Sequence, residues 1–295
     1  MSLTTLIFLA SLLPSLPSLY AQSQVNEGLP EDTKKVAKLQ DLKGEWYFSW
    51  GYNKEYWAPS DIHISQPDLD NDFTVHQVRA KDYPQWDTSG LIFDKSPVTP
   101  QYSIRVGRFV NEARTFALEF NYDHTKYSSV LDQHADVTGT VGGRSINQKI
   151  KLTETYFLYN LHNGANHIMV NLVQRLPLLG PLNQKGSLAG LLKEGVGIML
   201  PHADNTVLGK DNDVGKKGIK NVVGVSHGWW RLNGITAGVE AGIRMGIGHS
   251  MYLELTDKIA YAKLYNVPVY KGTASHSLWM NEMVLSLGFT IHGIQ

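Results

Sequence analysis

The 295-residue chain contains no cysteine. This absence excludes disulfide cross-links, thiolate metal sites and a cysteine nucleophile. Beyond the N-terminus, no uninterrupted apolar run reaches the roughly 18 residues that a transmembrane helix needs, so the sequence excludes a helical membrane protein. Lys plus Arg and Asp plus Glu are equal at 27 each. No basic surface therefore indicates nucleic acid as a partner.

Charge of either sign is scarce, because charged residues make up 18% of the chain against roughly 25% in a typical soluble domain. The sequence also lacks the GxxxxGK[ST], HExxH and GxSxG motifs, so nucleotide-binding and common hydrolase machinery is absent at the motif level. Glycine, tyrosine and tryptophan are plentiful at 27, 14 and 7 residues. This composition suits β-strands that approach closely and aromatic belts at membrane interfaces.

The N-terminal residues predict a secretory signal, because the apolar run Leu6 to Leu13 is followed by the small residue Ala21 and then a polar stretch. We expect cleavage after Ala21. The predicted organisation is a signal peptide over 1–21, a periplasmic lead-in over 22–43 and one β-barrel domain over 44–295.

The stretch Thr236 to Thr256 alternates between two kinds of side chain. One row holds apolar residues such as Val239, Ile243 and Leu253, and the other holds Gly, Glu, Arg and Thr. Successive side chains of a strand point to opposite faces, so this pattern predicts two amphipathic strands joined by a tight turn. In a soluble sandwich the polar row faces water, whereas in an outer-membrane barrel it faces the lumen.

Similar alternation predicts further strands along the chain. The expected strands are 45–52, 60–66, 72–80, 101–111, 114–123, 134–141, 147–160, 166–175, 194–200, 219–230 and 277–292. Between them, 83–100 predicts a loop or lumen insertion, Ser187 to Lys193 a short helix, and Pro201 to Gly218 an extracellular loop. About thirteen candidate strands and the expected even number indicate twelve, with ten as the fallback. The predicted fold class is all-β, an antiparallel transmembrane β-barrel closed as an up-and-down meander.

Four segments carry a family resemblance: YFSWGYN (Tyr47 to Asn53), SDIH (Ser60 to His63), DFTV (Asp72 to Val75) and DHTKY (Asp123 to Tyr127). They resemble a poorly characterised group of small outer-membrane β-barrels from Gram-negative bacteria, over roughly residues 44 to 293. The resemblance implies residence in the cell outer membrane, contact with its lipid, and insertion by the barrel assembly machinery. It implies no biochemical activity.

Charged residues on the polar rows are the first candidate site. We expect Glu119, Asp123, Glu240, Arg244 and Glu254 to line the lumen, where charges are tolerated only if they are paired or hydrated. Two arrangements remain open: a salt-bridged plug that closes the barrel, or a narrow aqueous path.

The second candidate site is His63 and Ser65, the only His-x-Ser pair in the chain. It resembles the pair used by two barrel enzymes that act on lipids, the outer-membrane phospholipase and the lipid A deacylase. On one strand face, His63 could deprotonate Ser65, and Gln77 on the next strand could orient the histidine. The alternative interpretation is that these are ordinary polar strand residues.

The sequence therefore favours a non-enzymatic outer-membrane barrel with a structural, binding or narrow-channel role. The alternatives are a lipid esterase that uses His63 and Ser65, and a secreted soluble barrel of lipocalin type. No cofactor and no metal site are expected. The expected partners are outer-membrane lipid, the assembly machinery and, for a binding role, a small solute or lipid ligand.

Overall fold

A computed structural model describes residues 45 to 291 apart from 83–100, 162–163, 183 and 215–230. The predicted signal peptide, the lead-in, the 83–100 loop, the 219–230 strand and the end of the 201–218 loop lie outside the described residues. Within the described part, no helix combines the length and apolar character needed to cross a bilayer.

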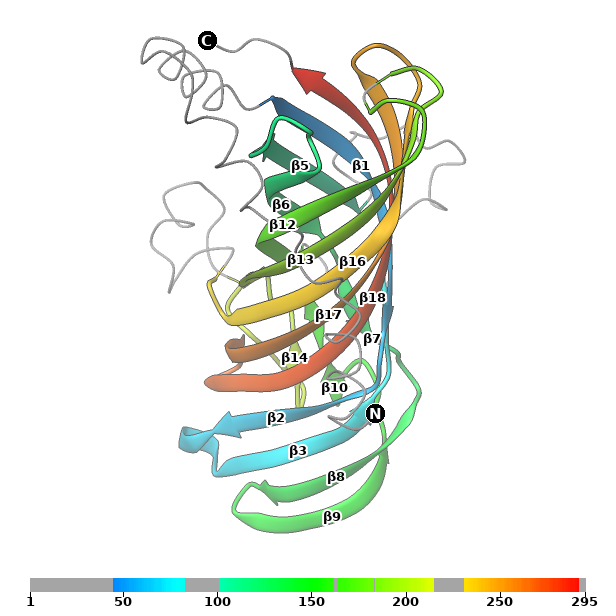
Figure 1. Cartoon of the computed structure of the whole chain (residues 1–295). Coiled ribbons are helices and arrows are strands. Elements are labelled where there is room, and N and C mark those ends of the chain that lie inside the picture. The colour runs from blue at the N-terminus through cyan, green and yellow to red at the C-terminus, as the bar shows by residue number, and fades with distance from the viewer. Residues whose placement is uncertain (1–44, 83–100, 162–163, 183, 215–230, 292–295) are drawn as a thin grey trace, which may run out of the picture. The chain divides into compact units, whose positions relative to one another are not determined.

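Eight antiparallel strands form a closed ring in chain order (Figure 1). They are β1 (Trp46–Trp57), β5 (Tyr102–Phe109), β6 (Phe116–His124), β12 (Ala165–Leu179), β13 (Leu188–Pro201), β16 (Gly234–Gly246), β17 (Met251–Val269) and β18 (Gly272–Ile291). The ring closes because β1 pairs with β18 from Trp46↔Ile291 to Trp57↔Met280. A barrel closed in this way leaves no free sheet edge around the ring.

Four more strands extend the same sheet beyond the ring. The first part of β18, Thr273 to His276, pairs with β2 (Ser60–Gln66) instead of β1. The sheet then continues through β3 (Asn71–Val78), β8 (His134–Val141) and β9 (Arg144–Lys151), which Figure 1 shows stacked in this order away from the ring. The sheet therefore has twelve strands, the number predicted from sequence, but eight of them close the barrel and four extend it.

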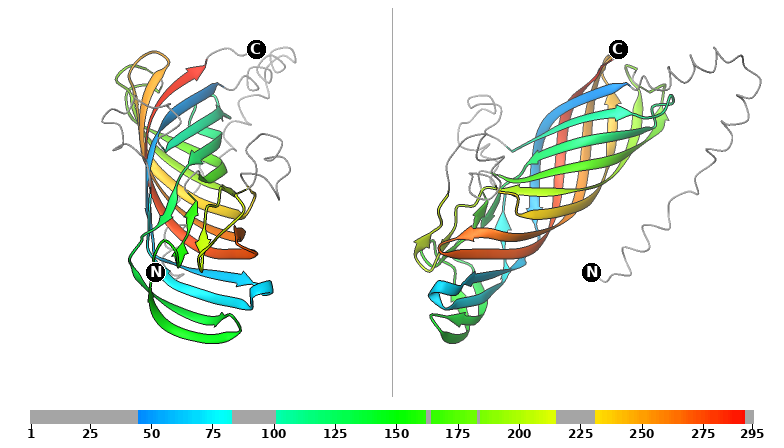
Figure 2. Two further views of the ribbon diagram at one scale, coloured as in Figure 1. Left: turned by 180° about the vertical axis from the view of Figure 1, so that it is seen from behind. Right: turned by 90° about the vertical axis from the view of Figure 1, so that its left-hand side faces the viewer.

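Short elements lie against the extension. They are the 3₁₀ turn η1 (Pro67–Leu69), β4 (Ala80–Lys81), β7 (Tyr127–Ser129), β10 (Phe157–Leu158), β11 (Asn160–Leu161), β14 (Thr206–Val207) and β15 (Lys210–Asp211). The short strands form two small sheets, β10-β14-β15 and β11-β7-β4 (Figure 2). We call β2, β3, β8, β9 and these short elements the head.

The head has a hydrophobic core of its own. The inward rows of β2, β3 and β8, including Ile62, Phe73 and Val137, pack in one cluster with side chains of the short strands, such as Tyr127 and Phe157. The same cluster includes inward side chains at the adjoining end of the ring, namely Met199, Ala260, Ala262, Leu264, Leu278 and Met280. An apolar core therefore covers this end of the barrel.

The two ends of the ring differ in their connections. At the end where β1 begins and β18 ends, the strands are joined by the short segments 110–115, 180–187 and 247–250. At the opposite end, long insertions carry the head between β1 and β5, β6 and β12, and β13 and β16. This asymmetry is typical of outer-membrane barrels, which have short periplasmic turns and long extracellular loops.

Two sequence predictions are wrong in detail. Ser187 to Lys193 is not a helix, because β13 begins at Leu188 and pairs with β12 and β16 on both sides. The strand predicted over 147–160 ends at Lys151, where the hairpin with β8 finishes. In the first case, pairing with two long neighbouring strands overrides the local helical propensity.

Candidate functional site

The alternating rows of the ring strands direct their charged side chains into the lumen. The structure places Glu119, Asp123, Glu240, Arg244 and Glu254 there, each no more than 3% exposed. Large apolar side chains are exposed on the outer face of all eight ring strands, including Phe120, Val170, Val196, Ile243 and Leu285. The barrel therefore has charges inside and apolar groups outside, the reverse of a soluble barrel.

Lys193 lies at the centre of the lumen charges. Its Nζ lies 2.6 Å from Glu254 Oε1 and 3.3 Å from both Glu119 Oε1 and Glu240 Oε1. Strand β13 supplies this lysine, whereas β6, β16 and β17 supply the three carboxylates. A single ammonium thus joins carboxylates from three other strands across the barrel.

Arg105 of β5 forms the second junction. Its Nη1 lies 2.8 Å from Glu240 Oε2 and 3.2 Å from Glu119 Oε1, while Nη2 lies 3.9 Å from Asp123 Oδ1. The guanidinium is fully buried. Because a planar guanidinium presents several donors in fixed directions, it can hold carboxylates from different strands at once.

Nearer the head, Lys258 pairs with both Asp123 and Glu282. Asn53 Nδ2 also donates to Glu282 Oε1 at 2.7 Å. Directly opposite Glu282 on β1 is Glu55, and both are buried. This level of the lumen is therefore richer in carboxylates than in cations.

Neutral side chains complete the network around Glu119. The Tyr47 hydroxyl donates to Glu119 Oε2 at 2.9 Å, and Asn171 Nδ2 donates to Oε1 at 3.2 Å. The Tyr47 ring lies over Gly107, where an added Cβ would stand 2.0 Å from the ring carbon Cζ. Gly107 is thus the residue that allows the tyrosine to reach across the lumen.

These ion pairs and hydrogen bonds cross the lumen from one wall to another. Buried ion pairs are tolerated only when each charge is paired and hydrogen-bonded, and here lysine, arginine and glutamate side chains from opposite walls meet one another. A water-filled path would instead leave these side chains solvated. Of the two arrangements left open by the sequence, these buried ion pairs favour the salt-bridged plug.

Sequence reasoning did not include Arg105, Lys193, Lys258 and Glu282 in the lumen. Lys258 continues the polar row Tyr252, Glu254, Thr256, so a longer reading of that alternation would have found it. Lys193 fell in the segment predicted to be helical. The cations that the sequence prediction omitted are the residues that join the predicted carboxylates to one another.

The catalytic candidates lie elsewhere, on the outer face of the head. His63 and Ser65 share this face of β2, but the contacts of His63 are with Thr74 Oγ1, 3.3 Å from Nδ1, and Asp72 Oδ1, 3.8 Å from Nε2. Gln77 bonds to Asp61 through its backbone N–H (2.8 Å) and its side chain (3.1 Å). No hydrogen bond among the described residues joins His63 to Ser65 or to Gln77.

A neighbouring histidine makes the closer contacts. His76 Nδ1 lies 3.1 Å from Asp61 Oδ2, and its Nε2 lies 2.8 Å from Thr138 Oγ1. Burial opposes ionisation of Asp61, but the hydrogen bonds from Gln77 and His76 outweigh it and hold the pKa of this carboxyl below its usual range. These contacts join three adjacent strands on an exposed face. No group of three His, Cys, Asp or Glu side chains in the described ranges is arranged to hold a metal ion.

The core of the head contains a buried histidine, His276. Its ring contacts Tyr127 and Tyr159 at centroid distances of 5.4 and 5.2 Å, and neither ring nitrogen has a hydrogen-bond partner within the described part of the chain. Burial lowers the pKa of His276 to about 3. Burial also raises the pKa of Tyr127 to about 12 and raises that of Tyr159. Both phenols are neutral throughout the acid range, so the histidine is the group of this cluster that can take up a proton there.

We expect acid to loosen the head through His276. The unfolded segment takes up a proton below about pH 6.5, whereas the folded one resists protonation until about pH 3. The stability contributed by the neutral imidazole of His276 is therefore complete above about pH 6.5 and is lost progressively as the pH falls toward about 3. Hydrogen exchange of the β2 and β3 amides, corrected for intrinsic rates, should rise between pH 6.5 and 4, and less so in His276→Leu.

The matched control is His63→Gln, which changes a partly exposed histidine of the same sheet. It should leave the acid response of the β2 and β3 amides as in the unmodified protein. An equal acid response in His276→Leu and the unmodified protein would contradict the assignment to His276.

The sequence matches no protein-family model and no curated protein. Among solved structures, it is similar to the outer membrane protein AlkL, with 12% identity and a TM-score of 0.38 over 86% of this chain and 92% of that one. It is also similar to the outer membrane protein OprG from Pseudomonas aeruginosa, with 10% identity, a TM-score of 0.36 and coverage of 85% and 97%. A third similar structure is the outer membrane protease OmpT from Escherichia coli, with 9% identity and a TM-score of 0.32 over 84% of this chain and 97% of that one.

Because these TM-scores are below 0.5, the assignment of the fold rests on strand pairing within this chain. The ring closes through β1 and β18, its outer face is apolar, and its ionised side chains are inside. The chain is a β-barrel protein of the outer-membrane type, as its sequence resemblance implies.

Proposed function

We propose that the protein is a closed integral barrel of the Gram-negative outer membrane, which anchors the head at the cell surface in a structural or binding role. One observation carries this proposal: the lumen is filled by the buried ion-pair network around Lys193 and Arg105. A barrel filled with paired side chains offers no continuous water path, so transport through it is not its function.

The outer surface supports residence in a membrane. Side chains such as Val239, Leu253 and Phe289 are 45, 37 and 39% exposed on three neighbouring strands. A continuous apolar surface of this extent is costly in water and is favoured in lipid. It also excludes the soluble lipocalin-type alternative, in which the apolar row would face the lumen. Outer-membrane lipid and, for insertion, the barrel assembly machinery are the partners that this proposal requires.

The lengths of the connections between the ring strands support an orientation with the head outside the cell. With short turns in the periplasm, the insertions that form the head lie outside the cell. A folded head with its own hydrophobic core is a stable platform, and binding sites are commonly built on such rigid supports. A small solute or lipid ligand in the binding role would thus be met by the head rather than by the lumen.

The hydrolytic alternative has less support. General-base catalysis needs the histidine within hydrogen-bond reach of the hydroxyl it activates. His63 instead contacts Thr74 and Asp72, and Gln77 orients Asp61 rather than His63. These residues form cross-strand pairs on an open face of the head.

Planar bilayer recording tests the closed barrel. Purified protein that has inserted, as shown by heat-modifiable migration in detergent gels, should give no conductance steps above the lipid background. A general porin reconstituted in the same way provides the positive control. Reproducible steps from the inserted protein would refute the closed lumen, and recovery of the native protein from the soluble periplasm would refute membrane residence.

A further inference from the structure

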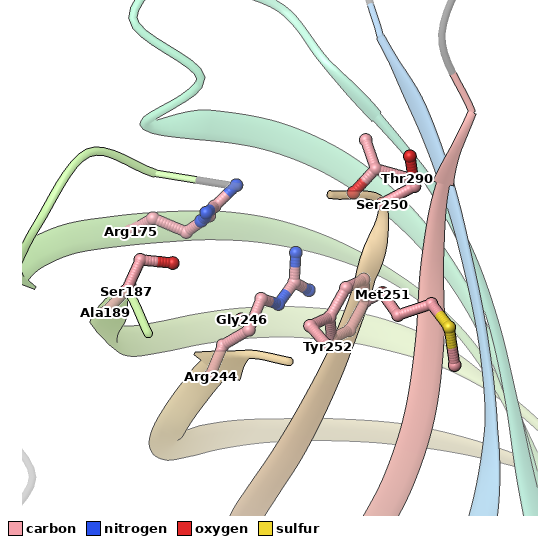
Figure 3. Close-up of a pocket in the computed structure, with 9 residues that line it drawn as sticks. All are labelled: Arg175, Ser187, Ala189, Arg244, Gly246, Ser250, Met251, Tyr252 and Thr290. Carbon is pink, nitrogen blue, oxygen red and sulfur yellow. The ribbon is translucent and has the colours of Figure 1, made fainter. Parts of the chain in front are cut away.

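The lumen leaves little room for a partner. At the end where β1 begins and β18 ends, Arg175, Arg244 and Tyr252 line a cavity that encloses about 10 Å³ and admits one water-sized group (Figure 3). The head, in contrast, ends in a free sheet edge. Strand β9 is the last strand of the twelve-stranded sheet, and within the described part of the chain it pairs only with β8 (Figure 1). A larger partner is therefore met at the head.

The pairing of β9 with β8 leaves one side of its backbone unused. A two-residue turn, Gly142-Gly143, joins the strands, and the ladder then includes all eight residues of β9 without a register shift. Val141 and Arg144 flank this turn, and the flanking residues of such a hairpin are a hydrogen-bonded pair. Every second residue from Ser145 therefore directs its N–H and C=O away from β8. No backbone group in the described ranges pairs with β9 on that side, so another strand can pair there.

Strand β9 lacks two of the features that usually protect a sheet edge, a proline and a bulge. Six of its eight residues are exposed. Its remaining protection is charge, because Arg144, Lys149 and Lys151 are cationic and no residue of β9 is acidic. Like charges on adjacent strands repel, so this composition disfavours pairing between two copies of β9. The same charges favour a strand that carries acidic residues.

The hairpin itself neutralises the lysines of β9 only weakly. Lys151 Nζ lies 2.7 Å from Asp132 Oδ1, and the two side chains are 52 and 69% exposed. Asp136, also exposed, lies opposite Lys149 in the ladder. Exposed ion pairs contribute little, because water and salt screen them. Both lysines are therefore available to carboxylates of a strand on the free side.

The two faces of β9 define what such a strand must carry. Ile146 and Ile150 pack against the core of the head and are only partly buried. Lys149 and Lys151 alternate with them and belong to the opposite face. Directly opposite residues of an antiparallel pair share a face, so a strand added beside β9 would extend both rows. Its apolar side chains would cover the isoleucines, and its acidic side chains would meet the lysines.

We propose that β9 is a docking edge for an extended segment of another protein, in which acidic residues alternate with apolar ones. Backbone pairing along the free edge provides affinity, and the two rows of side chains provide selectivity for this pattern. A protein segment of this chemistry is thus a partner for the binding role of the head. Only its location outside the cell rests on the function proposed above.

Fluorescence anisotropy of a labelled peptide tests the docking edge, with the folded full-length protein in neutral detergent. The probe is a peptide of the length of β9 in which Glu and Val alternate, and its control has Lys in place of Glu. We expect saturable binding of the Glu peptide and at least tenfold weaker binding of the Lys peptide. Asn147→Pro removes an N–H on the free side and should weaken binding of the Glu peptide at least tenfold. Asn147→Ala keeps this N–H and should bind as the unmodified protein does.

A second variant combines Lys149→Glu with Lys151→Glu, and it keeps the test valid if Asn147→Pro fails to fold. It should reverse the preference and bind the Lys peptide. Absence of saturable binding of the Glu peptide to the unmodified protein would overturn the proposal, as would undiminished binding by folded Asn147→Pro or an unchanged preference in the charge-reversed variant. So would a dimer that Asn147→Pro converts to a monomer, because a second copy would then occupy the edge. None of these results depends on membrane residence or conductance, which test the proposed function separately.

Discussion

Lys193→Met should destabilise the barrel by about 3–5 kcal/mol, the usual cost of removing one partner from a buried ion pair. The lysine lies within 3.3 Å of Glu119, Glu240 and Glu254, all of which are buried. Methionine fills similar space but leaves these carboxylates with less positive charge. Urea unfolding of the protein in vesicles, monitored by heat-modifiable migration in detergent gels, should show this loss as a lower urea concentration at the midpoint of unfolding.

Lys149→Met is the matched control, because Lys149 lies on β9 of the head, away from the ring, and is exposed. Exposed substitutions of this kind usually change stability by no more than about 0.5 kcal/mol. Equal midpoints for the two variants would show that the carboxylates around Lys193 are hydrated. The interpretation of the lumen as a closed plug would then be wrong.

The sequence predicted the ring strands well where one row was polar and the other apolar. From Thr236 to Thr256, Glu240, Arg244 and Glu254 fall on the inner face and Val239, Ile243 and Leu253 on the outer face. The prediction succeeds because strand side chains alternate strictly, so one charged residue fixes the orientation of its whole row.

The same alternation did not reveal the head. In β2 and β3, the apolar row of Ile62, Ile64 and Phe73 faces a protein core, and the polar row of His63 and Ser65 faces out. In the ring strands the two rows are reversed. A period of two is identical in both cases, so the sequence alone could not separate strands of the ring from strands of its extension.

The ion pairs across the lumen were also beyond the sequence. Arg105 and Glu240 lie 135 positions apart, and only the closure of the ring brings them to 2.8 Å. Lys193 was hidden for a different reason. Around it, Leu191 points inward and Leu192 outward, so both faces of β13 carry leucine and the local pattern favours a helix.

Leu285→Arg should be the most damaging change on the outside of the barrel. Leu285 is 58% exposed on β18, opposite Tyr52 of β1 and Leu255 of β17. An arginine on the lipid face costs about 2–4 kcal/mol at the middle of a bilayer. In water, the same substitution at so exposed a position would be nearly neutral. Urea titration of folding into phosphatidylcholine vesicles should show the full loss.

Thr273→Arg on the same strand separates lipid contact from a general effect of arginine in β18. Thr273 is exposed but pairs with Ser65 of β2, beyond the part of β18 that closes the ring. Its environment is water if the head lies outside the bilayer, so this variant should fold with nearly unchanged stability. A similar loss in both variants would place the head in lipid as well. No loss in either would mean that lipid does not surround the ring, and the apolar outer face would then need a protein partner to cover it.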